Sequence, residues 1–309
     1  MPDTLLNPAD AATASSPSRG LAALRVLRVP QWVKNFLVFV PVVLDHKLFD
    51  EPTMLRAGAA FVAFCAAASG AYIINDLLDR GADRGHPVKR HRPFASGLLP
   101  PAVGWVMAPA LGAAAFLVAF LLGSASFAGM LGLYVAVTTA YSVYLKRIAV
   151  LDVILLAGLY TLRVLAGIAA TGVRFSAWLL AFSMFLFLSL AFLKRYTELT
   201  TVDPGMTEML PRRGYQGRDR EWLGAMGGAS GYLSVLVLAL YINSDQVTVL
   251  YGNPLLLWMV CPLLLFWVSR MWLLAYRGEI ADDPIVATVR DPASYVVGAL
   301  VAFVLFGAQ

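Results

Sequence analysis

The sequence predicts an all-α, polytopic membrane protein. Of its 309 residues, 59% are hydrophobic and 14% are charged, and the mean hydropathy is +0.71. In soluble domains about a quarter of all residues are charged, so a soluble fold does not account for this composition. Apolar runs long enough to cross a bilayer as helices, about twenty residues each, recur along the chain. We therefore expect about nine transmembrane helices in one bundle.

The first twenty residues differ from the rest of the chain. They are rich in Ala, Ser, Pro and Asp and contain no apolar run, so we expect a disordered tail over 1–20 without a signal peptide. A single transmembrane domain would then occupy 21–309. Its predicted spans are 33–49, 54–75, 102–122, 127–145, 149–171, 176–194, 222–243, 253–274 and 291–308.

The distribution of basic residues predicts the orientation. With the N-terminus in the cytoplasm, most of the 24 Lys and Arg residues fall on the cytoplasmic side, as the positive-inside rule requires. We expect the inner (cytoplasmic) membrane, with the polar loops of any active site facing the cytoplasm. No nucleic-acid-binding module is visible. Cys65 and Cys261 lie in separate apolar runs, which predicts buried thiols and neither a disulfide nor a cysteine metal site.

The segment Asn75–Asp83 carries three carboxylates at the end of an apolar run. If this segment is helical, Asp76, Asp79 and Asp83 are at positions i, i+3 and i+7 and share one face. Like charges at this spacing repel one another, so a bound cation would stabilise the cluster. Oxygen-only ligands suit Mg²⁺, which binds through a few carboxylates and substrate phosphates. The alternative is a solvated loop.

The residues that follow these acids are cationic. Arg84, Lys89, Arg90 and Arg92 come within the next nine positions, and Lys and Arg are the side chains that bind phosphate oxygens. A positive-inside anchor would explain the cations but not the neighbouring acids. Carboxylates that can bind a metal therefore lie beside cations that can bind phosphate, and this combination predicts a site for a diphosphate substrate.

Polar residues near other span ends allow two interpretations. Lys34 follows the interfacial Trp32 and is either a snorkelling anchor or part of a site. Tyr141 and Lys146, close to the end of the span 127–145, either face a cytoplasmic cavity or form an aromatic belt with a basic anchor. The sequence Asp282-Asp283-Pro284 predicts a turn at the start of a helix, and we assign it no further role.

Two later spans also carry charges. Arg163 lies within the span 149–171, eleven residues after Asp152 and on nearly the same face. An Arg at membrane depth predicts function, here contact with an anionic lipid headgroup, and the alternative is a structural pair elsewhere in the bundle. Lys194 and Glu198 are four residues apart and form either a helical ion pair or part of a site opposite the first acids.

Together these residues resemble the UbiA superfamily of intramembrane prenyltransferases. Asn75–Asp83 matches the first Asp-rich signature of that superfamily, NDxxDxxxD, and Lys89-Arg90-x-Arg92-Pro93 followed by Gly97 matches what comes after it. Within the superfamily the chain is most similar to the subfamily of decaprenyl-phosphate phosphoribosyltransferases. The motifs behind this similarity are PQWVKN from Pro30, YTLR from Tyr160 and KRYTEL from Lys194.

The resemblance implies a fold, a reaction and a set of roles. The fold is a UbiA-type bundle around a cavity that opens to the cytoplasm. The reaction is the transfer of 5-phosphoribose from phosphoribosyl diphosphate to a polyprenyl phosphate, with release of diphosphate, in cell-wall biosynthesis. Asp76, Asp79 and Asp83 would be the catalytic metal ligands for Mg²⁺. The implied substrate-binding residues are Lys34, Asn75, Arg84, Lys89, Arg92, Tyr141, Lys146, Arg163, Lys194 and Glu198.

One departure from the superfamily pattern bears on the reaction. Prenyltransferases that act on aromatic acceptors usually carry a second Asp motif after the sixth span, and here Lys194, Arg195 and Glu198 occupy that place. This difference favours phosphoribosyl transfer. The first alternative is transfer of a polyprenyl group from its diphosphate to an aromatic or other small acceptor. A lipid transporter is the remote alternative, because transporters place their polar groups near the bilayer midplane.

Overall fold

The computed structural model describes residues 19–85, 89–200, 214–280 and 283–309, which form helices and connecting turns. The elements, in chain order, are α1 (Arg19–Val26), η1 (Val29–Phe39), α2 (Val40–Leu44), α3 (Glu51–Arg84), η2 (Lys89–His91), α4 (Pro101–Leu121), α5 (Ala125–Val143), η3 (Leu145–Arg147), α6 (Leu151–Thr171), α7 (Ala177–Leu199), η4 (Gly217–Asp219), α8 (Arg220–Ile242), α9 (Asp245–Leu250), η5 (Pro254–Met259), α10 (Val260–Tyr276), α11 (Pro284–Thr288) and α12 (Pro292–Ala308). The described part of the chain contains no β-strand, which confirms the all-α prediction.

Among the residues that the structure describes, seven helical stretches are long and apolar enough to cross a membrane. They are α3 to α7, the η4–α8 stretch Gly217–Ile242 and the η5–α10 stretch Pro254–Tyr276. The first and last predicted spans are shorter, Val29–Leu44 and Pro292–Ala308. The count of nine full-length spans is therefore not confirmed. The predicted span 33–49 ends at Leu44, because the polar pair Asp45-His46 begins a turn there.

Local sequence sets where the helices begin. The side chains of Asp50, Ser124, Ser176 and Asp291 each accept a hydrogen bond from a backbone N–H of the first turn of the helix that follows. Short polar side chains at this position replace the hydrogen bonds that the first turn lacks. Each of these caps lies where a predicted apolar run starts, so the helix starts are encoded locally.

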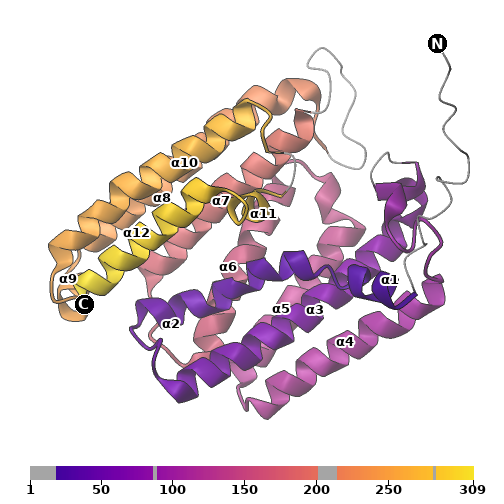
Figure 1. Cartoon of the computed structure of the whole chain (residues 1–309), viewed down its shortest axis with the longest axis horizontal. Helices are drawn as coiled ribbons and strands as arrows, with labels where there is room; N and C mark the ends of the chain where they lie inside the picture. Colours follow the sequence, from indigo (N-terminus) through magenta and orange to yellow (C-terminus); the bar gives the residue numbers. More distant parts are fainter. Residues whose placement is uncertain (1–18, 86–88, 201–213, 281–282) are drawn as a thin grey trace, which may run out of the picture.

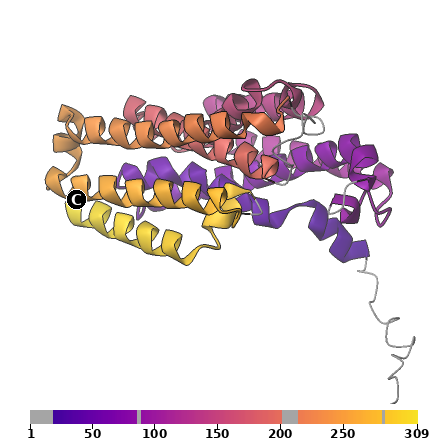
Figure 2. The same ribbon diagram turned by 90° about the horizontal axis from the view of Figure 1, so that it is seen from above.

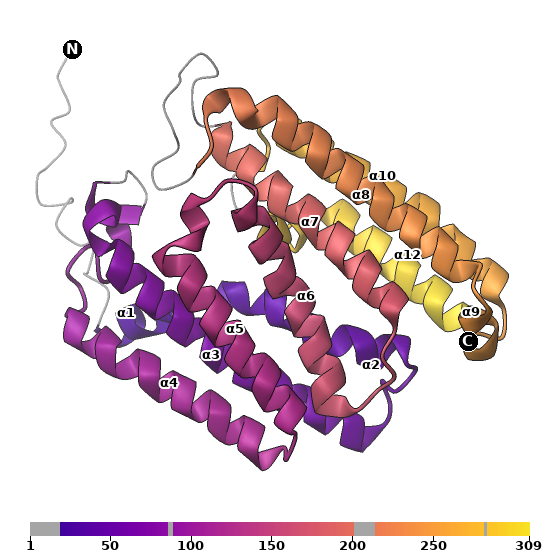
Figure 3. The same cartoon turned by 180° about the vertical axis from the view of Figure 1, so that it is seen from behind.

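The helices pack as a bundle with α3 and α6 inside it. Figure 1 shows α3, α4 and α5 side by side at one end and α8, α10 and α12 at the other, and Figure 3 shows α6 and α7 between them. In Figure 2, α12 lies along an outer edge of the bundle. Among the candidate spans, α3 and α6 have the largest buried share. These two inner helices carry Asp76 and Arg163.

A close backbone contact joins η1 to α6. A Cβ atom added at Gly167 of α6 would lie 2.2 Å from the carbonyl oxygen of Val38, whereas one at Gly158 of the same helix would meet nothing within 4 Å. Small residues let helix backbones approach in this way. The contact holds η1, the element that carries Lys34, against the centre of the bundle.

Gly167→Ala is therefore expected to destabilise the protein by about 1–3 kcal/mol, the usual cost of overpacking. Thermal unfolding in detergent measures the effect. Gly158→Ala is the matched control, and its melting temperature should be unchanged or higher, because Ala is the better helix former. Equal melting temperatures for the two variants would contradict the close packing of η1 on α6.

Candidate functional site

The three predicted carboxylates lie on one continuous helix. The helix α3 runs through Asp76, Asp79 and Asp83 and ends at Arg84, so the segment is helical as predicted. The side chains of Asp76 and Asp83 are buried, and that of Asp79 is partly exposed. Carboxylates rarely stay buried without partners, and each of these three has a cationic one.

The partners of the acids come from three other segments. Arg28, which follows α1, donates from Nη2 to Asp76 Oδ1 at 2.5 Å. Arg92 donates from Nη1 to Asp76 Oδ1 at 3.1 Å and to Asp83 Oδ2 at 2.7 Å.

Lys146 of η3 binds the third acid, with its Nζ 2.8 Å from Asp79 Oδ2 and 3.3 Å from Asn75 Oδ1. We call Arg28, Asp76, Asp79, Asp83, Arg92 and Lys146 the acid cluster. The structure thus brings together the predicted Asn75, Arg92 and Lys146 with the three acids. It also adds Arg28, to which we had assigned no role.

The acid cluster has donor chemistry that fits Mg²⁺. Carboxylate and amide oxygens are the hard ligands that this ion takes, together with substrate phosphates. Within the described ranges, no group of three or more His, Cys, Asp or Glu residues is close enough to hold a metal ion. In this arrangement the cations of Arg28, Arg92 and Lys146 neutralise the carboxylates. A metal ion would have to compete with these ion pairs.

A second polar group joins residues that are far apart in the sequence. Lys34 Nζ of η1 lies 2.7 Å and Lys194 Nζ of α7 lies 2.8 Å from the same oxygen, Asp283 Oδ2. The other oxygen of Asp283 accepts the backbone N–H of Ile285 at 3.2 Å and caps α11. We call Lys34, Lys194 and Asp283 the lysine pair site.

The charge state of Asp283 follows from its neighbours. Burial by itself would raise the pKa of Asp283, but the ammonium groups of Lys194 and Lys34 outweigh burial and hold this pKa well below its usual range. The carboxylate is therefore ionised at neutral pH. The sequence predicted only a helix-entry turn here, and its neighbour Asp282 lies outside the described residues.

Arg195 organises a buried network beside the lysine pair site. Its guanidinium forms ion pairs with Asp152 and Glu198, and its Nη2 donates to the hydroxyl of Tyr141 at 2.6 Å. The hydroxyl of Tyr215 donates to the second oxygen of Asp152 at 2.7 Å. Glu198 therefore has Arg195 as an ion-pair partner, and its predicted helical pair with Lys194 stays a prediction.

Arg163 lies inside the bundle among protein partners. Its Nε donates to Asn35 Oδ1 at 2.9 Å, its Nη1 to the Leu159 carbonyl at 2.6 Å and its Nη2 to the Tyr134 hydroxyl at 3.0 Å. These contacts match the structural alternative, while Asp152 pairs with Arg195 instead. A role for Arg163 in substrate binding stays a prediction.

The remaining predicted residues lie at the edge of the acid cluster. Arg84 is exposed and donates from Nε to the carbonyl of Ala95 at 3.3 Å, and Lys89 is exposed at the start of η2. Of the loop 205–220, only residues from Gly214 onward are described. Spacing did not indicate the contacts of Arg28, Asp152, Tyr215 and Asp283, because their partners are distant in the chain.

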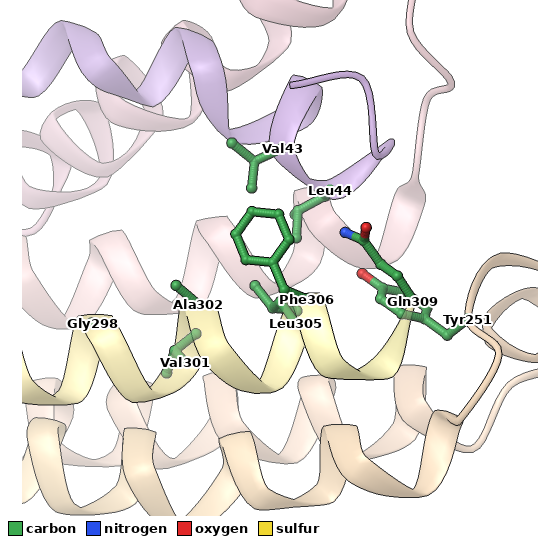
Figure 4. Close-up of a pocket in the computed structure, with 9 residues that line it drawn as sticks. All are labelled: Val43, Leu44, Tyr251, Gly298, Val301, Ala302, Leu305, Phe306 and Gln309. Carbon is green, nitrogen blue, oxygen red and sulfur yellow. The ribbon is translucent and has the colours of Figure 1, made fainter. Parts of the chain in front are cut away.

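An apolar cavity lies at the far end of the segment that starts with η1. It has a volume of about 230 Å³ and lies between α2 and α12, where Val43 and Leu44 face Leu305 and Phe306 (Figure 4). Tyr251 and Gln309 line one side of it. The segment Val29–Leu44 therefore has Lys34 near one end and apolar cavity-lining residues at the other.

Comparison with solved structures shows the fold. A UbiA homologue from Archaeoglobus fulgidus, solved with DMAPP and Mg²⁺ bound, aligns with a TM-score of 0.70 over 92% of this chain and 98% of that chain, at 16% sequence identity. At this identity the likeness concerns the fold alone. The bundle is thus of the UbiA type.

Comparison with other sequences gives three relatives. The uncharacterized protein y4nM of Sinorhizobium fredii is 39% identical over 90% of this chain and 54% of its own length. The nodulation protein NoeC of Azorhizobium caulinodans is 36% identical over 87% of both chains. A decaprenyl-phosphate phosphoribosyltransferase of Corynebacterium glutamicum is 38% identical over 59% of this chain and 57% of its own length. The chain thus spans only about half of the length of two of these relatives.

A family model covers most of the chain. The model described as the UbiA prenyltransferase family matches residues 42–287, a range that includes the acid cluster apart from Arg28, and includes Lys194 and Asp283. Together with seven candidate membrane spans and the UbiA-type bundle, this match identifies the protein as a multi-pass membrane transferase that belongs to the UbiA prenyltransferase family.

Proposed function

We propose that this protein transfers 5-phosphoribose from phosphoribosyl diphosphate to a polyprenyl phosphate and releases diphosphate. The observation that carries the proposal is the pairing of one acid cluster with a separate lysine pair site. In place of a second acidic group after the sixth predicted span, α7 presents Lys194 and Arg195. The partial match to the decaprenyl-phosphate phosphoribosyltransferase of Corynebacterium glutamicum supports the same reaction.

The chemistry needs little from the protein beyond charge and position. A phosphate oxygen of the acceptor attacks C1 of the ribose, the bond from C1 to the diphosphate oxygen breaks, and diphosphate leaves with the electron pair. The acceptor phosphate is already an anion, so no strong base is required. Holding the two substrates in line supplies a large part of the rate.

The leaving group sets the roles proposed for the acid cluster. Asp76, Asp79 and Asp83 would hold Mg²⁺, which neutralises charge on a departing diphosphate, and Asn75 would orient the sugar diphosphate. With the carboxylates held by a metal, Arg92 and Lys146 would be available for phosphate oxygens, because these cations lie within 3.1 Å of the acids. Lys89 and Arg84 would bind phosphate oxygens at the edge of the acid cluster.

The other predicted residues have roles on the acceptor side. Lys34 and Lys194 would contact phosphate, while Tyr141 and Glu198 hold Arg195 beside them. The apolar cavity between α2 and α12 is the place that we propose for part of the polyprenyl tail. We further propose that the acid cluster and the N-terminus face the cytoplasm, which contains soluble sugar diphosphates, in the inner membrane.

A product assay tests the proposal. Purified protein in detergent, incubated with Mg²⁺, polyprenyl phosphate and radiolabelled phosphoribosyl diphosphate, is expected to yield a labelled lipid, and EDTA should abolish it. A denatured sample is the control. If folded protein yields no labelled lipid but transfers a prenyl group from a polyprenyl diphosphate to a small acceptor, the alternative reaction is correct.

A further inference from the structure

The lysine pair site carries an excess of positive charge in a buried place. Two ammonium groups share one carboxylate oxygen at 2.7 and 2.8 Å, so the three side chains have a net charge of about +1 when both lysines are protonated. The side chain of Lys34 is 7% exposed and that of Asp283 is 9% exposed. A buried charge without an opposite charge is costly, so this site favours one more anionic group.

The neighbouring charges do not remove this excess. Arg163 donates hydrogen bonds to Asn35, Tyr134 and a backbone carbonyl, all of which are uncharged. Arg195 has two carboxylate partners, Asp152 and Glu198, so this group has a net charge of about −1. That charge offsets the positive charge of Arg163 and leaves the excess at the lysine pair site. The acid cluster differs, because there three cations face three carboxylates. One group is thus suited to a metal and a diphosphate, and the other to a phosphate without a metal.

We propose that the lysine pair site binds the phosphate of the lipid acceptor directly, without a metal ion, and that Asp283 positions the two lysines for it. This inference rests on the proposed function and assigns each substrate to one of the two polar groups. Lys34 and Lys194 come from η1 and α7, and Asp283 brings their ammonium groups to one point. A phosphate monoester offers three oxygens, enough to accept from both ammonium groups at once.

The surroundings favour a lipid phosphate over a free one. The Nζ of Lys34 lies 5.7 Å from the centre of the Tyr160 ring, and Lys34 is on the apolar segment Val29–Leu44, which ends at the apolar cavity. An anionic headgroup at the lysines would therefore have an apolar path beside it for its tail. Inorganic phosphate would gain nothing from this path.

Binding of farnesyl phosphate in EDTA tests the proposal. The wild-type protein in nanodiscs should bind this short polyprenyl phosphate without metal, and should bind farnesol and inorganic phosphate much more weakly. Lys34→Met and Lys194→Met should each weaken binding by about tenfold to a hundredfold, the effect of losing a hydrogen bond to a charged group. Lys47→Met is the matched control, because Lys47 is exposed and pairs with Asp45, and it should leave binding unchanged.

Asp283→Asn separates positioning from a merely structural role. Asn keeps an oxygen that can cap α11, but it removes the negative charge that competes with the phosphate for both lysines. We expect farnesyl phosphate to bind several-fold more tightly to this variant in EDTA, with a lower kcat because the free lysines are less well placed. Weaker binding together with an unchanged kcat would contradict this role for Asp283.

Donor binding distinguishes failure of this inference from failure of the proposed function. Mg²⁺-dependent binding of phosphoribosyl diphosphate should change little in Lys34→Met and Lys194→Met. If these variants lose donor binding and keep farnesyl phosphate binding, the inference is wrong although phosphoribosyl transfer stands. If wild-type protein binds farnesyl phosphate through the lysines but makes no phosphoribosyl lipid, the inference stands and the proposed donor is wrong.

Discussion

Asp76→Asn and Asp83→Asn are each expected to lower turnover in the product assay by about a thousandfold or more, which corresponds to about 4 kcal/mol of transition-state stabilisation. Asn keeps the size of the side chain but removes the charge that a divalent cation requires. Both acids lie buried on one face of α3. Binding of Mn²⁺ in the presence of diphosphate, measured by electron paramagnetic resonance, should fall in parallel.

Asp50→Asn is the matched control for these variants. Asp50 caps the opposite end of the same helix by accepting the backbone N–H of Thr53 at 3.1 Å, and Asn caps helices equally well. Its turnover and melting temperature should equal those of the wild type. Wild-type turnover in both Asp76→Asn and Asp83→Asn would show that the acids hold no catalytic metal.

Replacement of Arg195 is expected to produce the largest loss of stability. Arg195→Met removes the cationic partner of Asp152, a fully buried carboxylate, which keeps the hydrogen bond from the Tyr215 hydroxyl. Removing one partner of a buried ion pair costs about 3–5 kcal/mol, because the other charge stays desolvated. Unfolding in detergent, followed by near-ultraviolet circular dichroism, measures the loss.

Two further variants distinguish the loss of a buried ion pair from the loss of an Arg side chain in general. Arg174→Met breaks a pair with Asp45 in which the Arg side chain is 68% exposed, and exposed pairs contribute about 1 kcal/mol or less. The double variant Arg195→Met with Asp152→Asn should regain part of the lost stability, because no buried charge is then left alone. A single Arg195→Met variant no less stable than Arg174→Met would refute the buried network.

Several features of the fold were predictable because they depend on local sequence. The apolar runs predicted helices that the structure contains, and the acids of Asn75–Asp83 lie on a helix as their spacing indicated. The first span was predicted at 33–49 but lies at Val29–Leu44, since a run of apolar residues does not show where η1 begins or where it changes to α2. Backbone geometry there depends on packing against Gly167 and α6.

The candidate site was predictable only in part, because spacing is read from the sequence but contacts between distant elements are not. The acids, Lys146 and Arg92 were identified by residue type and spacing, and the structure places them in contact. The pairing of Glu198 with Arg195 was not predictable from spacing, because two cations are near Glu198 on the same helix. The position of the Arg195 guanidinium depends on Tyr141 and Asp152, which lie on other helices.

The sequence by itself determined that this is a helical membrane protein. It also determined that three carboxylates share one helix face and that a run of cations follows them, because hydropathy and residue spacing are local properties. Only the tertiary structure decided the partners of each charge. Lys34 and Asp283 are 249 positions apart, and no periodicity connects them. They meet because burial of the helices leaves each charged group in a medium where it must find an opposite charge or a hydrogen-bond partner.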